Sequence, residues 1–245
     1  MFFLQLPVIV VVLAAFSSTS YLTVPPRGVT LQWFAKVLGD PSYIDAIVFS
    51  VVLALAATLG SLVIGSAAAY ALVRRRVPGA AAIEALVMAP MAFPAVVIGV
   101  ALLQFYVLVG LRGGFLGLAM AHIMLTVPYV VRSVTANLVG VDPRLEEAAR
   151  VLGADGWTAF RLVTLPIIRS GLVAGGLFSF IVSFDNVPVT IFLLSVRQTT
   201  LPVKIFTAVE HGVDPSIAAV STLLIVATGL ILFLAERWVG LHRYV

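Results

Sequence analysis

Six long runs of apolar residues restrict the fold of this 245-residue chain more than any other feature. A helix needs about 20 apolar residues, within a range of about 17 to 25, to cross the hydrocarbon core of a bilayer. Only 11% of the residues are charged, whereas soluble domains carry about 25%. The sequence therefore predicts an all-α integral membrane protein with a single transmembrane domain over residues 1–245, embedded in a lipid bilayer.

The predicted transmembrane helices cover residues 2–16, 47–73, 83–109, 115–134, 172–196 and 217–239. The first is short, and no basic residue precedes it. We prefer a transmembrane helix whose basic lead is missing because the start was assigned too late. The alternative is a secretory signal peptide with Ser17, Ser18 and Ser20 near its cleavage site, although a signal peptide normally begins with a basic region.

The distribution of basic residues predicts the orientation, because cytoplasmic loops carry an excess of Lys and Arg. Six spans place both termini on one side of the membrane. If the loop between the fourth and fifth spans is cytoplasmic, ten basic residues lie inside and five outside, so both termini are predicted to be cytoplasmic. The inner set is Arg74, Arg75, Arg76, Arg132, Arg144, Arg150, Arg161, Arg169, Arg237 and Arg243; the outer set is Arg27, Lys36, Arg112, Arg197 and Lys204.

Residues 141–166 form the longest polar interruption and hold seven of the 26 Lys, Arg, Asp and Glu residues. Asp142 followed by proline predicts the start of a short helix, and Gly153 predicts its end in a left-handed conformation. Asp155 predicts the cap of a second short helix that ends at Pro166. The large apolar side chains of this second helix are Trp157, Phe160 and Leu165. A short helix with bulky apolar groups suits docking into a groove on a partner.

Seven positions in this loop follow a fixed spacing. They are Glu147, Ala148, Ala149, Gly153, Val163, Leu165 and Pro166. This spacing resembles the EAA loop of ABC importer permeases, which reads EAA, three residues, Gly, nine residues, Ile, one residue, Leu-Pro. The one departure is Val163 in place of Ile, a side chain of similar volume. The alternative is a solvated amphipathic hairpin between two membrane helices.

Further segments extend the resemblance over nearly the whole chain from about Thr30 onward. They are RRRVPG, PYVVRSV, SFDNVPVTIFL and TTLPVKIFTAVEHGVDPSIAAVSTLLI. These segments are similar to the second permease subunit of polyamine-type importers. Permeases for ferric iron, thiamine and aminoalkylphosphonate share much of the pattern, so these solutes remain alternatives. The N-terminus departs from the family, in which a basic lead is expected.

The resemblance implies the fold of a type I ABC importer permease in a bacterial inner membrane, with a coupling helix at about residues 155–163. The implied partners are a second permease subunit, two cytoplasmic ABC ATPase subunits and a periplasmic substrate-binding protein. ATP and Mg would bind to the ATPase subunits, so this chain would bind no cofactor and have no catalytic residue. The residues implied to couple to the ATPases are Glu147, Ala148, Ala149, Gly153, Asp155, Trp157, Phe160, Leu165 and Pro166.

Asp185 is a charged residue inside the predicted fifth span. A charge at the centre of a membrane helix costs about 2.5–3.5 kcal/mol and usually faces a cavity, a partner or a transport pathway. We therefore assign Asp185, Asn186, Pro188 and Pro94 to a substrate pathway, and an anionic group there favours a cationic solute. The alternative is a structural aspartate hydrogen-bonded to Asn186 or to a neighbouring helix.

Two features of the predicted spans favour helix packing. His122 lies alone in the fourth span, where an interhelical hydrogen bond is a better interpretation than a proton relay. Gly171 and Gly175 have the GxxxG spacing that permits two helices to approach closely.

Other function classes lack their sequence signals. The chain has no cysteine and no clustered histidines, so no metal site is expected. Its basic residues form no stripe for a nucleic acid, and it contains no Walker A phosphate loop. A secondary transporter or channel would explain six spans but not the loop spacing. A membrane enzyme would need clustered His, Asp or Glu at a membrane face.

Overall fold

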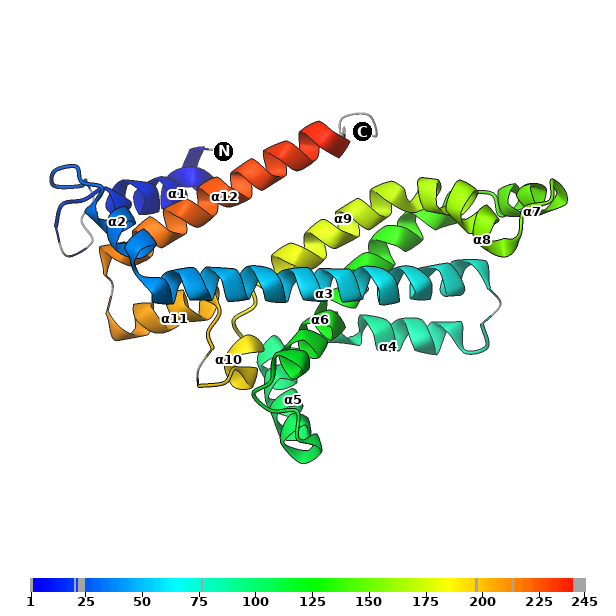
Figure 1. The fold of residues 1–245 in the computed structure, drawn as a ribbon, viewed down its shortest axis with the longest axis horizontal. Helices are drawn as coiled ribbons and strands as arrows, with labels where there is room; N and C mark the ends of the chain where they lie inside the picture. Colours follow the sequence, from blue (N-terminus) through cyan, green and yellow to red (C-terminus); the bar gives the residue numbers. More distant parts are fainter. Residues whose placement is uncertain are drawn as a thin grey trace. The chain divides into compact units, whose positions relative to one another are not determined.

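The computed structural model describes residues 2–19, 21, 25–75, 77–196, 198–212 and 214–239 (Figure 1). The regular secondary structure of these residues is entirely helical. They form two compact units, with Met1–Val48 and Thr200–Val245 in unit 1 and Phe49–Thr199 in unit 2. The single-domain interpretation stays a prediction. Four residues named in the predictions above, Ser20, Arg76, Arg197 and Arg243, lie outside the described ranges.

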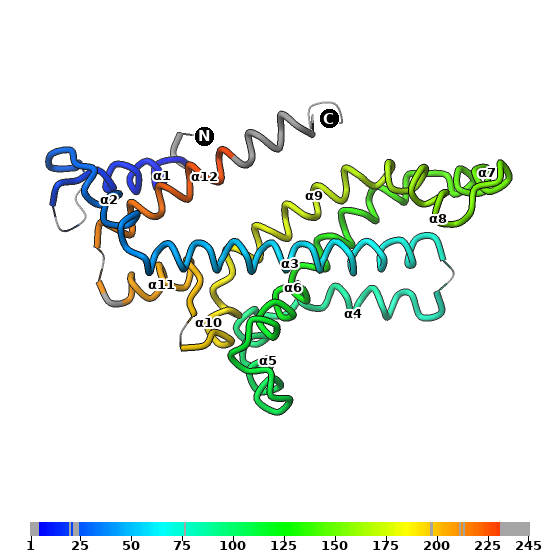
Figure 2. The backbone as a smooth tube through the Cα atoms, viewed as in Figure 1, coloured from blue at the N-terminus to red at the C-terminus, as the bar shows by residue number. Residues whose placement is uncertain are grey.

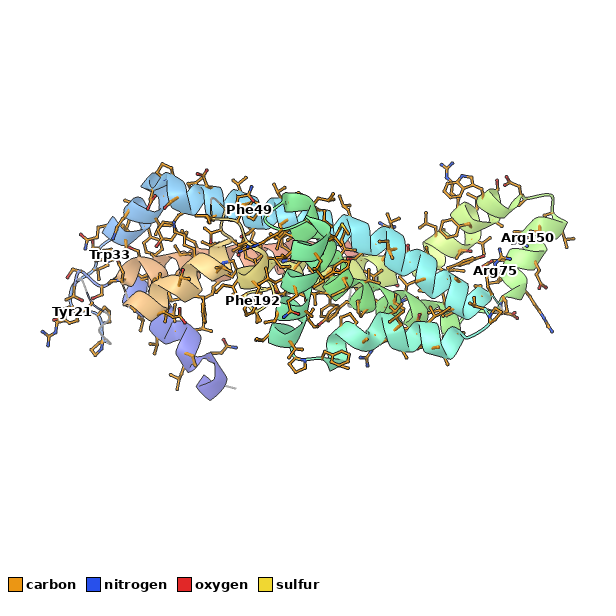
Figure 3. All side chains as sticks on the ribbon, turned by 90° about the horizontal axis from the view of Figure 1, so that it is seen from below. Tyr21, Trp33, Phe49, Arg75, Arg150 and Phe192 are labelled. Atoms are coloured by element: carbon orange, nitrogen blue, oxygen red, sulfur yellow. The ribbon has the colours of Figure 1, made fainter. Side chains whose placement is uncertain are left out.

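Unit 1 contains helices from the N-terminal and C-terminal parts of the chain, and both α1 and α2 pack against α12. Lys36 of α2 forms an ion pair of 2.9 Å with Asp214, which precedes α12. The Trp33 indole, labelled in Figure 3, donates a hydrogen bond of 2.8 Å to the Ser17 carbonyl. The helices are α1 (Phe2–Ala15), α2 (Gln32–Gly39), α11 (Leu201–His211), α12 (Pro215–Val239) and the first residues of α3 (Pro41–Arg74).

Unit 2 contains the rest of α3 and the central helices. Its main helix pair is α6 with α9, which lie side by side in Figure 1, while α4 packs on α6 and α5 packs on α10. One hydrophobic cluster of this unit joins four valines and Leu138 of α6 to Ala69 of α3 and Ile168 of α9. The elements are α4 (Ala80–Ala92), α5 (Ala95–Val109), α6 (Phe115–Val139), α7 (Arg144–Val151), α8 (Gly156–Ala159), η1 (Phe160–Thr164), α9 (Leu165–Phe184) and α10 (Thr190–Leu193).

The GxxxG spacing on α9 produces the predicted close approach. A Cβ atom added to Gly171 would lie 2.7 Å from the Ser133 carbonyl oxygen of α6. One added to Gly175 would lie 2.9 Å from the Cα atom of Val130. Because real Cβ contacts are longer than this, only glycine permits the observed separation of α6 and α9.

Three described helical stretches are long and apolar enough to cross a membrane: Pro41–Arg74, Phe115–Val139 and Gly156–Phe184. Ala80–Ala92 and Ala95–Val109 meet this criterion only together, and they are bent by 107° (Figure 2). Shorter apolar helices cover Gln5–Ala15 and Pro215–Leu230. The chain is therefore a multi-pass membrane protein by length and composition, and the count of six spans stays a prediction.

The predicted third span, 83–109, is not one straight helix. Phe93 and Pro94 have extended backbone conformations, with ψ angles of 146° and 128°, and they separate α4 from α5. Proline disfavours a helical conformation of the residue before it and has no N–H for the helix ladder. Pro90, by contrast, lies inside α4.

The predicted fifth span, 172–196, also needs correction. Its helix ends at Phe184, and α10 begins only at Thr190. The Asn186 side chain accepts hydrogen bonds from the backbone nitrogens of Val189 (3.1 Å) and Thr190 (3.4 Å). Such side-chain bonds compete with a continuous helix, and Pro188 contributes no N–H to continue it.

Candidate functional site

The loop between α6 and α9 contains a helix with a complete C-terminal cap. Gly153 has a φ angle of +94°, as predicted, and its N–H bonds to the Arg150 carbonyl at 3.0 Å. The N–H of Ala154 bonds to the Ala149 carbonyl at 3.0 Å. These two bonds form the Schellman motif, which reverses the chain direction after α7.

Asp155 caps the next helix, also as predicted. Its Oδ1 accepts a hydrogen bond of 2.8 Å from the Thr158 N–H. Hydrogen bonding from Thr158 stabilises the carboxylate form and lowers the pKa of Asp155 below its usual value. The start of the predicted coupling helix is therefore fixed by a charged cap at an exposed position.

The end of this second helix differs from the prediction. Pro166 does not stop it, because helical structure continues from Gly156 to Phe184. Residues Phe160–Thr164 form a π-helical turn that ends two residues before the proline. A wider turn relieves the clash between the proline ring and the carbonyl four residues earlier. The predicted short helix is thus the first part of a long membrane helix.

The outer surface of the loop is unusually apolar. Trp157, Leu162 and Leu152 expose 68%, 67% and 88% of their surface. Trp157 stacks on Phe160 with ring centroids 5.7 Å apart, and Phe160 meets Tyr70 of α3 edge-on at 5.9 Å. Of the other predicted coupling residues, Glu147, Ala148 and Leu165 are exposed and Ala149 is half-buried.

A groove of about 400 Å³ lies between this loop and the end of α3. Arg75 and Arg150, both labelled in Figure 3, line it together with aromatic side chains. The groove thus offers a partner apolar surface and two basic groups, Arg150 from the loop and Arg75 from directly after α3. The groove is lined by Ser66, Ala67, Tyr70, Arg75, Arg150, Gly156, Trp157 and Phe160.

Sequence reasoning missed Glu146, the neighbour of Glu147. The Glu146 carboxylate accepts hydrogen bonds from the hydroxyls of Tyr70 (2.8 Å) and Thr164 (2.9 Å), and its Oε1 lies 3.4 Å from Arg74 Nε. The side chains of Arg74 and Glu146 are only 8% and 12% exposed. The one signal in the sequence was helical spacing: Glu146 lies three residues before the apolar Ala149, so the two share one side of the helix.

Asp185 lies at the C-terminal end of α9, and its side chain is exposed. Among the described residues, its carboxylate has no hydrogen-bond or ion-pair partner. Phe178 and Ile181 precede it by seven and four residues, so they share its exposed face of the helix. The predicted alternative, a bond between the Asp185 side chain and Asn186, is not present.

The other predicted pathway residues lie on neighbouring segments. Pro94 is exposed at the start of α5, and Pro188 is exposed in the segment between α9 and α10. A Cβ atom added to Gly99 of α5 would lie 3.0 Å from the Pro188 carbonyl oxygen. The helix breaks at Pro94 and Pro188 therefore belong to segments that pack together.

His122 confirms the interpretation of an interhelical hydrogen bond. It is fully buried, with Nδ1 2.8 Å from the Ser183 hydroxyl of α9 and Nε2 3.1 Å from the Thr190 hydroxyl of α10. His122 thus attaches both sides of the Asp185 interruption to α6. Within the described ranges, no three His, Cys, Asp or Glu residues are close enough to hold a metal ion.

Residues 61–242 match the family model described as the binding-protein-dependent transport system inner membrane component. The chain is 32% identical to the spermidine/putrescine transport system permease protein PotC of Haemophilus influenzae, over 96% of this chain and 91% of that protein. It is 31% identical to the putrescine transport system permease protein PotI of Escherichia coli, over 95% and 85%.

Other similarities extend beyond polyamine systems. The molybdenum transport system permease protein ModB of Escherichia coli is 30% identical, over 83% of this chain and 96% of that protein. A bacterial ABC transporter that imports alginate has a TM-score of 0.77 at 16% identity, over 96% of this chain and 90% of that one. An amino acid ABC transporter has a TM-score of 0.61 at 20% identity, over 85% and 99%. The two solved structures establish the shared fold.

Proposed function

Since the chain belongs to the family of binding-protein-dependent transport system inner membrane components, and is therefore an ABC importer permease, we propose that it imports a polyamine such as spermidine or putrescine. Two of its relatives, PotC and PotI, are named for polyamine transport and cover most of its length. ModB, named for molybdenum transport, shows that the family handles other solutes. The choice of solute therefore needs support from the chain itself.

The exposed Asp185 carboxylate is the observation that carries the proposal. It has no partner among the described residues, and an uncompensated charge inside a membrane protein usually faces water or a pathway. Polyamines carry several ammonium groups, so a carboxylate along their route lowers the electrostatic barrier to their passage. Phe178 and Ile181 supply apolar surface on the same face for the methylene segments of such a solute.

The proposed complex contains a second permease subunit, two cytoplasmic ABC ATPase subunits and a periplasmic binding protein. The exposed apolar surface around Trp157 is the proposed site of ATPase docking. Gly156–Phe184 is one helical stretch of 29 residues, about 43 Å long at the standard rise. We propose that ATPase closure moves its Trp157 end and that the helix carries this movement to Asp185.

The test is Asp185→Asn in the assembled transporter, with Asp185→Glu as the matched control that retains the charge. We expect Asp185→Asn to reduce spermidine uptake by about tenfold, the effect of losing about 1.4 kcal/mol of favourable interaction. Asp185→Glu should retain most uptake, and basal ATPase activity should persist in both variants. Wild-type spermidine uptake by a stable Asp185→Asn complex would remove Asp185 from the pathway.

The solute itself is tested through the cognate binding protein. Spermidine and putrescine should raise its melting temperature, because a ligand that binds only the folded state stabilises it by mass action. A shift with ferric iron, thiamine or aminoalkylphosphonate, and none with a polyamine, would replace the proposed solute while leaving the ABC permease assignment intact. Uptake that continues in a cell without the ATPase subunits would instead favour a secondary transporter.

A further inference from the structure

The Glu146 carboxylate joins three segments that are far apart in the sequence. It lies on α7, its Oε2 bonds to Tyr70 on α3, and its Oε1 bonds to Thr164 in η1. The same Oε1 faces Arg74 at the end of α3. Arg74 also donates from Nη1 to the Val141 carbonyl at 3.1 Å, at the start of the loop. Both ends of the loop are thereby attached to α3.

The charges in this cluster depend on each other. Arg74 Nε is buried and has no hydrogen bond among the described residues, so its compensation is the ion pair with Glu146. If Glu146 lost its charge, the guanidinium would remain in a poorly solvated site, where Nη1 still donates to the Val141 carbonyl. Breaking a buried pair on one side is unfavourable because the remaining charge is left uncompensated.

The position of the cluster connects an exposed surface to a membrane helix. On α7, Glu147 and Ala148 face outward while Glu146 faces α3. A partner that pushes on the exposed face of α7 therefore acts on α3 through the Glu146 carboxylate. The continuous helix Gly156–Phe184 would carry a movement of the loop into α9, but this helix does not include α3.

We infer that Glu146 is a positioning residue that transmits movement of the coupling loop to α3, through Arg74, Tyr70 and Thr164. This inference rests on the proposed docking of the loop onto ATPase subunits. It assigns separate tasks to adjacent glutamates: Glu147 faces the partner, and Glu146 links the loop to the membrane helix. Loss of this link should uncouple ATP hydrolysis from transport without dismantling the complex.

The first experiment compares Glu146→Gln with wild type in the complete transporter reconstituted in proteoliposomes, with spermidine as the solute. Glutamine keeps the shape and one acceptor but removes the charge that compensates Arg74. We expect the number of ATP molecules hydrolysed per spermidine imported to rise by about threefold or more, a typical effect on coupling between sites. Thr164→Val, which removes one hydrogen bond, should change the ratio in the same direction by less.

Glu84→Gln is the matched control, because Glu84 is an exposed carboxylate on α4 without an ion-pair partner among the described residues. It should leave the ratio and the yield of complex unchanged. The inference is overturned if Glu146→Gln leaves the ratio at the wild-type value, including the case in which uptake and hydrolysis fall in proportion. If wild type fails to import spermidine, the failure belongs to the proposed solute.

A second measurement is independent of the solute. The chain has no cysteine, so spin labels can be placed on Val63→Cys of α3 and Leu145→Cys of α7, which are 71% and 51% exposed. In wild type, the distance between the labels should keep a narrow distribution on ATP binding, because the loop and α3 move together. In Glu146→Gln, the distribution should broaden when ATP binds. Equal widths in both proteins would contradict the inference.

Discussion

At the scale of single residues, adjacent side chains in this loop have opposite environments. Successive residues of a helix differ by about 100° in direction, so Glu146 turns to α3 while Glu147 turns away. The spacing of the EAA pattern marks Glu147, yet the buried charge belongs to its neighbour. A motif identifies the surface offered to a partner more readily than the contacts that hold that surface in place.

We predict that ATPase docking depends on the backbone conformation of Gly153. Its φ angle is +94°, and a Cβ atom added there would meet no other atom within 4 Å, so a substitution causes conformational strain rather than a clash. Gly153→Val should cost about 1–2 kcal/mol for a left-handed residue with a Cβ atom. The displaced α8 should lower the amount of ATPase subunit that copurifies, while the permease still inserts in the membrane.

Gly153→Asn is the comparison, because asparagine tolerates the left-handed region better than other residues with a side chain. It should retain more ATPase than Gly153→Val. Equal copurification of wild type and Gly153→Val would mean that the cap does not position the docking surface.

At the scale of helices, the close packing of α6 and α9 depends on two glycines, Gly171 and Gly175. Alanine normally stabilises a helix relative to glycine by about 0.5–1 kcal/mol. At Gly171 and Gly175 the new methyl group would collide with the α6 backbone, so both alanine variants should instead destabilise the protein. The measurement is the thermal unfolding of the detergent-solubilised complex.

The control is Gly229→Ala in α12, where a new Cβ atom meets no other atom within 4 Å. This variant should be neutral or slightly stabilising. If all three alanine variants unfold at the same temperature as wild type, α6 and α9 separate easily, and the close approach contributes little to stability.

At the scale of the whole molecule, the orientation in the membrane is the main open prediction. The excess of basic residues predicts that Gln32 lies outside and Arg144 in the cytoplasm. Single cysteines at these exposed positions, in a chain without native cysteine, report the orientation directly. In intact cells with a permeabilised outer membrane, an impermeant maleimide should label Gln32→Cys and leave Arg144→Cys unlabelled. Labelling of Arg144→Cys alone would show that the orientation is the reverse of the predicted one.

The sequence by itself determined the class of the molecule and the surface of the loop. Apolar length and scarce charge are enough to predict membrane helices, because the thickness of the bilayer fixes the length of a span. Local backbone chemistry is enough to predict the Gly153 turn and the Asp155 cap, since both depend on a few neighbouring residues. Family spacing then predicted an ABC permease, which the family match confirms.

Tertiary structure decided where the helices are interrupted and which charges are buried. Pro90 and Pro166 lie within helical stretches, whereas Pro94 and Pro188 lie at breaks, and proline alone does not distinguish these outcomes. A π-helical turn absorbs Pro166, while bonds from Asn186 hold the break near Pro188. The Glu146 carboxylate joins residues that lie 76 and 18 positions away along the chain. Such contacts depend on which helix faces meet, and only the packed chain determines that.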